Sequence, residues 1–315
     1  MTAPILIQLH RPPIATEKSQ RIIAIGKFDG IHIAHQAVIH RAVEVARTLK
    51  LSSSLFTFDP HPRFVLTGDA AYARVLTPLQ ERAKVARALG VETIFAARFN
   101  RDFQQQTAKE FVLQYLLPLG ARHLVVGYDF RFGKQGRYTP DDLRLIGEEY
   151  HVGVDVVQAV DFDGIPVSSS MIRKELADGR IDQVMGFLGR PYRIRGHVIQ
   201  GDQRGRAIGF PTANLCLTEN YVLPALGVYV VDVWIDNERK RAVMNVGRRP
   251  TFYKEGELTI EVHVLSFTGD LYGSEMIVDI LHYIRGEQRF PDLAALQHRL
   301  LLDVEIAATW ISPIQ

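Results

Sequence analysis

The sequence predicts an α/β protein with two domains, a doubly wound parallel sheet in residues 1–186 and a small antiparallel β-barrel with a C-terminal helix in residues 187–315. Three observations predict this. The length of 315 residues is typical of two domains. The first part alternates apolar strands with helices, as parallel sheets do. Beyond about residue 185 short strands with alternating apolar residues follow, which is typical of a small closed barrel.

Each element of the first domain has a local signal. Strands are expected at Arg21–Gly26, Leu55–Phe58, Glu92–Ala96, His123–Gly127 and Val154–Ala159. Val38, Ala42, Val45 and Leu49 recur at helical spacing after the first strand. Pro78–Leu89 is a helix ended by Gly90, and Thr107 and Thr139 begin two more helices.

The second domain is expected to begin near Gln183–Arg190. Gly227–Ile235 is almost wholly apolar and reads as a strand. Leu258–Val264 alternates, so that Thr259, Glu261 and His263 share the polar face of that strand. Further elements are a strand marked by Met276, Val278 and Ile280 and a helix marked by Leu293, Leu296, Leu300 and Val304.

Composition excludes several classes of protein. The net charge is +2 and the basic residues are scattered, so no nucleic-acid partner is expected. No apolar run approaches about 18 residues and no secretory signal is present, so we expect a cytoplasmic protein without a membrane partner. Cys216 is the single cysteine and is expected to be a buried apolar residue. The chain is expected to be a monomer or a weak homo-oligomer.

The segment Gly205–Asn214 combines a glycine-rich turn with Pro-Thr-Ala-Asn. Glycines let backbone N–H groups approach a phosphate closely. Thr212 and Asn214 are two apart and would project from one face of a strand, offering oxygen ligands to Mg²⁺. The alternative is a polar hairpin turn, because Gly, Pro and Asn are common in turns.

A second candidate site, Gly26–His35, lies between the first strand and its helix. Ligands bind open α/β sheets at the carboxyl ends of the strands, and a helix N-terminus there favours phosphate. His32 and His35 fall on one face of the first turn, where two imidazoles can stabilise charge on a triphosphate. The alternative is two solvent-exposed histidines at the start of a helix.

These segments resemble a known family. Gly205–Asn214 is similar to the riboflavin kinase signature, and four further segments resemble riboflavin kinases in the expected order: 245–252, 261–263, 271–273 and 284–290. His-x-x-His resembles the His-x-Gly-His motif of Rossmann-like nucleotidyltransferases. Gly26–Gly30, Thr57–Pro62, Val126–Gly133 and Ser168–Arg173 resemble the adenylyltransferase module of bacterial bifunctional riboflavin kinase/FAD synthetases. The resemblance covers about residues 20–300.

For the barrel, the resemblance implies a riboflavin kinase. Glu261 would be the catalytic base, and Thr212 and Asn214 would hold Mg²⁺. The ATP phosphates would contact Gly201, Gly205, Arg206, Gly209 and Pro211. Riboflavin would contact Asn245, Arg249, Arg285 and Phe290, with Arg285 and Phe290 in a mobile flap. From the pattern alone, Glu261 could instead be a solvent-facing strand glutamate.

For the sheet, the resemblance implies an FMN adenylyltransferase in which His32 and His35 contact the ATP phosphates. The other phosphate-binding residues would be Gly26, Phe28, Gly30, Asp129, Ser168, Ser169, Ser170 and Arg173. Phe58 and His61 would contact the flavin. Without the resemblance, the serine cluster is equally an ordinary helix N-cap. The chain departs from the family pattern at Ala34, where glycine is expected, and at Ser170, where threonine is usual.

The resulting hypothesis is a bifunctional enzyme that forms FMN from riboflavin, and FAD and pyrophosphate from FMN, with ATP as co-substrate and Mg²⁺ as cofactor. One alternative, motivated by Ala34, is a riboflavin kinase with an impaired or regulatory N-terminal nucleotidyltransferase-like domain. Others are a module that senses flavin or nucleotide or binds RNA, and an adenylyltransferase for another phosphorylated substrate.

Overall fold

The structure is a computed structural model that describes residues 5–14, 19–201, 205, 208–236, 238–248 and 258–311. The chain divides into two compact units, Met1–Ser169 and Ser170–Gln315. Helices α7 (Ser169–Ala177) and α8 (Ile181–Leu188) therefore fall almost wholly within the second unit. The functional boundary at residue 186 stays a prediction.

The first unit is built on a parallel sheet of six strands in the order β1-β4-β3-β2-β5-β6. Its strands are β1 (Ile5–Leu9), β2 (Arg21–Ile25), β3 (Ser52–Asp59), β4 (Thr93–Arg98), β5 (Ala121–Gly127) and β6 (Gly153–Val157), and β7 (Asp161–Phe162) and β8 (Ile165–Pro166) form a separate pair. This confirms the predicted doubly wound sheet. The sequence analysis missed the edge strand β1.

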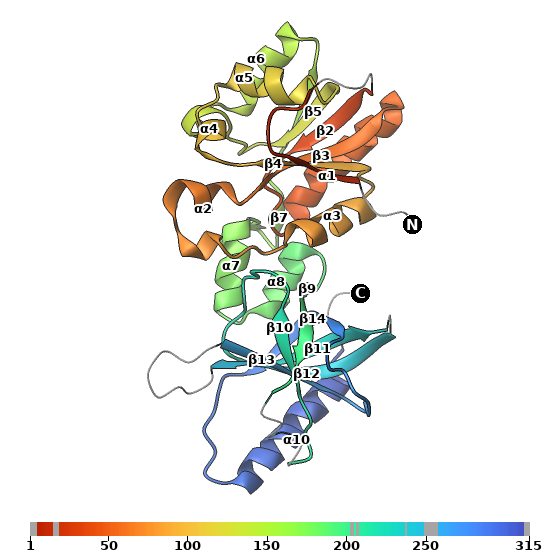
Figure 1. Cartoon of the computed structure of the whole chain (residues 1–315), viewed down its shortest axis with the longest axis vertical. Coiled ribbons are helices and arrows are strands. Elements are labelled where there is room, and N and C mark those ends of the chain that lie inside the picture. The colour runs from red at the N-terminus through yellow and green to blue at the C-terminus, as the bar shows by residue number, and fades with distance from the viewer. Residues whose placement is uncertain are drawn as a thin grey trace. The chain divides into compact units, whose positions relative to one another are not determined.

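Helices cover both faces of this sheet (Figure 1). They are α1 (Ile33–Leu49), α2 (Pro62–Thr67), α3 (Leu79–Ala88), α4 (Arg101–Gln104), α5 (Ala108–Phe111) with a π turn at Val112–Leu116, and α6 (Pro140–Glu149); short 3₁₀ turns lie at Ala70–Tyr72 and Lys134–Gly136. Helices α1 and α3 pack against Ile22 and Ala24, and α5 and α6 enclose a second core with Phe56. Burial on both faces explains why β2 is apolar from Ile22 to Ile25. Thr107 and Thr139 form the predicted capping boxes.

The second unit contains a closed antiparallel barrel in the order β10-β13-β12-β11-β14-β9. The strands are β9 (Tyr192–Ile199), β10 (Ala213–Leu217), β11 (Gly227–Ile235), β12 (Glu238–Arg248), β13 (Leu258–Val264) and β14 (Glu275–Arg285). Helix α10 (Leu293–Thr309) packs on β11 and β12 outside the barrel (Figure 1). The predicted barrel and C-terminal helix are confirmed. The prediction for Cys216 is wrong: Leu215 points inward, so the next side chain on β10 is exposed.

Candidate functional site

The order of the strands places the first site at a switch point of the sheet. β2 lies between β3 and β5, so the chain winds away from β2 in both directions. In such sheets ligands bind at the carboxyl ends of the two strands that flank the switch. The loop after β2 carries Gly26–His32, and the loop after β5 carries Asp129, which is exposed.

His32 and His35 lie together at the N-terminus of α1. His32 caps the helix, because its Nδ1 accepts a hydrogen bond from the His35 N–H at 3.3 Å. The two rings stack with centroids 3.6 Å apart, and the Phe28 ring meets His35 edge-on at 5.2 Å. His32 is 4% exposed, so the alternative of two solvent-exposed histidines is wrong for this residue.

The loop before His32 is tightly wound. Phe28, Gly30 and Ile31 all have positive φ, of 51°, 95° and 38°. A side chain at Gly26 would lie 3.1 Å from the Phe28 ring, so glycine lets the loop close over β2. The result is a compact turn that leads directly into the N-terminus of α1, and a helix N-terminus is suited to phosphate.

Asp29 joins this loop to two other segments. Its side chain is fully buried, and its Oδ1 accepts hydrogen bonds from the N–H groups of Leu76 at 2.8 Å and Thr77 at 3.1 Å. Its backbone carbonyl accepts a hydrogen bond from the Ser169 hydroxyl at 2.7 Å. The structure therefore places Ser169, one of the predicted phosphate-binding serines, directly beside the histidine loop.

The other predicted clamp residues surround this serine in the sequence. Ser168 precedes α7, and Ser170 and Arg173 lie on its first turns, three residues apart and so on one face of the helix. Ser170 and Arg173 belong to the second unit. Their contact with phosphate stays a prediction.

An aromatic cavity of about 430 Å³ opens beside β3 and β4. Phe58 lines it, as expected for a flavin contact, together with Phe99, Phe103 and Phe111. The cavity also carries three basic side chains, Lys27, Arg63 and Arg131. The sequence analysis missed all of these except Phe58, because single phenylalanines in separate helices and loops carry no local signal of a shared cavity.

His61 takes a different place from Phe58. Its Nδ1 accepts a hydrogen bond from the Arg63 N–H at 3.2 Å and so caps α2, and its ring lies 5.2 Å from the ring of Tyr72. It is buried and is not among the residues lining the aromatic cavity. A direct contact between His61 and flavin stays a prediction.

The second site lies on the outer face of the barrel. Register aligns Glu261 of β13 with Asn214 of β10 on one side and with Asn245 of β12 on the other. Thr212, just before β10, donates a hydrogen bond from its hydroxyl to Glu261 Oε2 at 3.2 Å. Four residues singled out from the sequence thus converge, and Glu261 is half-buried among them rather than solvent-facing.

A cavity of about 320 Å³ lies between this face and α10. Its lining includes Gly205, Thr212, Asn245, Glu261, Arg285 and Phe290 from the predicted set, and Leu296, Leu300 and Asp303 from α10.

Arg285 ends β14, and its guanidinium donates to the fully buried Asp303 from Nε at 3.0 Å and from Nη2 at 2.7 Å. The Phe290 ring lies 5.7 Å from the guanidinium of Arg285. Sequence reasoning missed the helix contribution, since Asp303 resembles any polar residue of an amphipathic helix.

Glycines allow close packing in the segment that leads to Thr212 and Asn214. A side chain at Gly201 would collide with the Asn214 amide, and one at Gly205 would collide with the carbonyl of Phe210. Gly209 has a φ of 86°. Pro211 accepts a hydrogen bond at its carbonyl from His263 Nδ1 at 2.8 Å, which links the turn to β13. Arg206 and Arg249, both predicted to bind ligand, lie outside the described residues.

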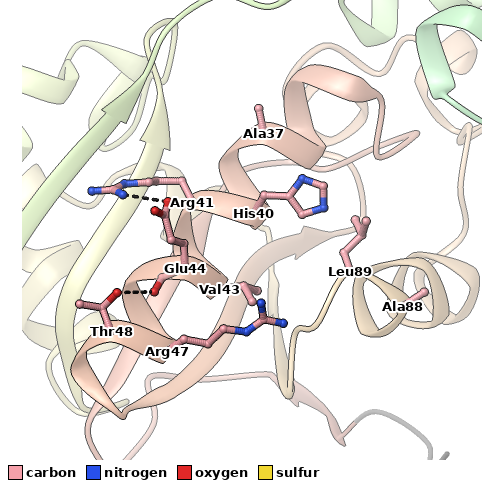
Figure 2. A pocket seen from close by; sticks show the side chains of 9 residues that line it. All are labelled: Ala37, His40, Arg41, Val43, Glu44, Arg47, Thr48, Ala88 and Leu89. Atoms are coloured by element: carbon pink, nitrogen blue, oxygen red, sulfur yellow. Dashed lines mark hydrogen bonds and ion pairs between the residues drawn. The ribbon is translucent and has the colours of Figure 1, made fainter.

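A larger cavity of about 710 Å³ lies on the outer side of α1 and carries none of the predicted site residues. Figure 2 shows its lining, in which Arg41 pairs with Glu44 at 2.9 Å while His40 points toward Leu89. Its charged groups are of both signs and face solvent. Volume alone therefore does not identify the chemistry of this protein.

Comparison with known proteins matches a different family model to each half of the chain. The FAD synthetase family model matches residues 14–171, and the riboflavin kinase family model matches residues 188–311. A bifunctional riboflavin kinase/FMN adenylyltransferase from Bacillus subtilis (strain 168) is 35% identical over 308 residues, 96% of each chain. A protein of the same description from Pseudomonas fluorescens is 39% identical over 305 residues, 96% of this chain and 94% of its own.

One solved structure has the same fold over 98% of this chain and 100% of its own, with a TM-score of 0.91 and 32% identity; it is described as a macrolide-efflux protein from Streptococcus pneumoniae. None of the helices within the described ranges combines the length and apolar character needed to cross a membrane. Because the two family models together match nearly all of the sequence, and its relatives align with it almost from end to end, the chain belongs to the bifunctional riboflavin kinase/FMN adenylyltransferase family.

Proposed function

We propose that the barrel phosphorylates riboflavin with ATP to give FMN and ADP, and that the parallel sheet adenylylates FMN with a second ATP to give FAD and pyrophosphate. The observation that carries this proposal is the convergence of Thr212, Asn214, Asn245 and Glu261 beside one cavity. The stacked histidines at the switch point of the sheet support the second activity.

In the kinase reaction, riboflavin lies between the barrel and α10 with its terminal ribityl hydroxyl toward Glu261. The Glu261 carboxylate accepts the hydroxyl proton as the oxygen attacks the γ-phosphorus of ATP. A new oxygen–phosphorus bond forms, the bond to the β-phosphate oxygen breaks, and ADP leaves. Thr212 holds the carboxylate in place through its hydroxyl.

Mg²⁺ fits the residues present. Thr212 and Asn214 offer side-chain oxygens beside the Glu261 carboxylate, a hard donor set that leaves room for water and phosphate oxygens. When bound, the ion would neutralise charge on the ATP phosphates. Within the described ranges no cluster of three or more His, Cys, Asp or Glu side chains offers another metal site.

ATP has a route to this centre that does not cross the flavin cavity. A second cavity of about 570 Å³ borders Pro211 and Thr212 and is lined by Phe267, Leu271 and Tyr272. Thr212 lines both cavities. The nucleotide therefore approaches Thr212 from one side and riboflavin from the other, which suits an in-line transfer.

In the adenylyl transfer, a phosphate oxygen of FMN attacks the α-phosphorus of ATP and pyrophosphate leaves. No protein nucleophile is needed. His32, His35 and the N-terminus of α1 stabilise charge on the triphosphate. The isoalloxazine ring occupies the aromatic cavity, and the basic side chains of Lys27 and Arg131 face the FMN phosphate.

The direct test is chromatography of flavins after the pure protein is incubated with riboflavin, ATP and Mg²⁺. Successive appearance of FMN and FAD is expected. FMN alone, with added FMN also unconverted, would favour the alternative of a kinase with an impaired or regulatory first domain, which Ala34 motivates. No conversion of riboflavin would overturn the kinase assignment. Mg²⁺ dependence is checked with excess chelator, which should stop both reactions.

Glu261→Gln tests the base. We expect it to lower FMN formation by at least about 100-fold, because the amide cannot accept the hydroxyl proton. Adenylylation of supplied FMN should be unchanged, which makes the other activity of the same chain the control. A variant with full kinase activity would show that Glu261 is not the base.

Location and assembly are further predictions. A cytoplasmic location and the absence of nucleic-acid and membrane partners are predicted from charge and from the lack of a long apolar run, and the chain is predicted to be a monomer or a weak homo-oligomer. Light scattering after gel filtration tests the oligomeric state, and retention on RNA at varied salt tests nucleic-acid binding.

A further inference from the structure

Arg82 on α3 is a buried charge that no motif points to. It is 3% exposed and lies beneath the carboxyl end of β3. Its Nη1 donates to the Thr57 hydroxyl at 3.0 Å and to the Phe58 carbonyl at 3.4 Å, and its Nη2 donates to the Thr77 carbonyl at 3.2 Å. A buried arginine is costly unless its donors and its charge are matched.

Each partner of Arg82 leads to a different part of the adenylyl-transfer site. The Thr57 hydroxyl donates to the Lys27 carbonyl at 2.8 Å, in the loop that leads to the histidines. Thr77 donates its N–H to the Asp29 carboxylate at 3.1 Å. Phe58 lines the aromatic cavity. One guanidinium therefore joins the phosphate loop to a wall of the flavin cavity.

Two carboxylates lie close enough to act on the charge of Arg82. Burial lowers the pKa of the guanidinium, while the carboxylates of Asp29 and Asp59 oppose that shift. Asp29 is itself fully buried within the Gly26–His32 loop, which is proposed to bind an anion. The positive charge of Arg82 therefore offsets negative charge that would otherwise disfavour a triphosphate.

We propose that Arg82 is a positioning residue for adenylyl transfer, holding the Gly26–His32 loop and the Phe58 wall at the separation that brings FMN to the α-phosphorus of ATP. This inference rests on the proposed second activity of the chain. Arg82 makes its contacts through the Thr57, Phe58 and Thr77 segments and does not itself line the aromatic cavity. A misplacement of about 1 Å can cost about 100-fold in rate, so such a residue matters without touching the reacting atoms.

The test compares Arg82→Met, Arg82→Lys and Arg87→Met in the full chain, with FMN adenylylation and riboflavin phosphorylation measured separately. Arg82→Met should lower kcat for FAD formation about 10- to 100-fold and leave the kinase reaction unchanged. Arg82→Lys, which keeps the charge and can still reach Thr57, should recover most of the loss. Arg87→Met is the matched control, because Arg87 is a half-buried arginine on the same helix whose Nη1 donates to the Val91 carbonyl at 3.4 Å and to none of the partners of Arg82.

Three outcomes overturn the inference. The first is FAD formation by Arg82→Met within about twofold of wild type. The second is a loss that only follows the fraction of folded first unit, measured by circular dichroism, with no recovery in the lysine variant. The third is an equal loss in Arg87→Met. If the wild-type chain itself makes no FAD from FMN, the proposed second activity fails, and this result is distinct from the other three.

Discussion

Ala34 lies between the two stacked histidines, in the first turn of α1. It is absent from the residues with positive φ, so its methyl group is accommodated without backbone strain. The departure from the family pattern therefore requires no unusual backbone conformation at this position. We expect its methyl group to limit how closely a phosphate can approach the helix N-terminus.

Ala34→Gly measures that effect. Removing the methyl group should lower KM for ATP in FMN adenylylation by about two- to fivefold, because the backbone N–H groups become more accessible. Glycine also loosens the first turn, so the first unit should lose up to about 1 kcal/mol of unfolding free energy. Steady-state kinetics with FMN and varied ATP gives the constant. An unchanged KM would show that the methyl group does not face the phosphates.

Residues that belong to a continuous motif could be predicted from the sequence. Thr212 and Asn214 belong to the Pro-Thr-Ala-Asn segment, and Glu261 lies on the polar face of an alternating strand, so each has a signal in the neighbouring sequence. Arg82 and Asp303 were not predicted, because each owes its role to partners far away in the sequence. Nothing within a few residues of either one distinguishes it from an ordinary charged residue of a helix.

At the scale of elements, α10 has an unusual anchor. Its only buried residues within the described range are Asp303 and Ala307. Asp303 accepts hydrogen bonds from Arg285 of β14 and pairs with Arg299 of its own helix at 3.0 Å. The helix that closes the flavin cavity is thus attached to the barrel through a buried charge network as well as through apolar contact.

Asp303→Asn should therefore loosen this attachment. Losing the charge leaves Arg285 buried without a matching anion, which we expect to cost about 3 kcal/mol of unfolding free energy. Both tryptophans of the chain, Trp234 and Trp310, lie in the second unit, so tryptophan fluorescence in urea reports on that unit alone.

The matched control is Arg299→Met, which removes the more exposed of the two arginines. It should cost less than half as much, because Asp303 keeps Arg285. Equal losses in the two variants would contradict the special role of the pair between Asp303 and Arg285.

Elements were predictable where a face of the sheet or barrel is buried. The prediction of the strand Leu258–Val264 gave both its ends and its buried face correctly, since Ile260, Val262 and Val264 fill the barrel. β1 was missed because an edge strand with exposed Ile5 and Ile7 shows no such alternation. Cys216 was assigned to the core because it has leucines on both sides, although neighbours on a strand point in opposite directions.

At the scale of the whole molecule, the chain joins two sites that use the same compound in opposite roles. FMN is the product of the barrel and the substrate of the sheet. Each proposed site is formed by residues of one unit, apart from the phosphate contacts predicted for Ser170 and Arg173. Fusion alone therefore does not require that FMN pass directly between the sites.

Mixing two disabled chains tests this. Glu261→Gln should lack the kinase and His35→Ala should lack adenylyl transfer, so each alone fails to make FAD from riboflavin. An equimolar mixture should make it, because released FMN reaches the intact sheet of the other chain. Chromatography of flavins over time gives the result. No FAD from the mixture, with each remaining activity intact, would mean that FMN is not released.

Barrel closure has a consequence for how the kinase site can change over evolutionary time. Asn214, Glu261 and Asn245 face one another only while three neighbouring strands keep their register. In a closed barrel the hydrogen-bond register of every strand is fixed by both of its neighbours. A one-residue insertion within β13 therefore cannot be absorbed by a shift of an edge strand, because the barrel has no edge. It would exchange Glu261 for an apolar neighbour from the interior. Changes of chain length are therefore confined to the connecting loops, and variation within the strands must proceed by substitution alone.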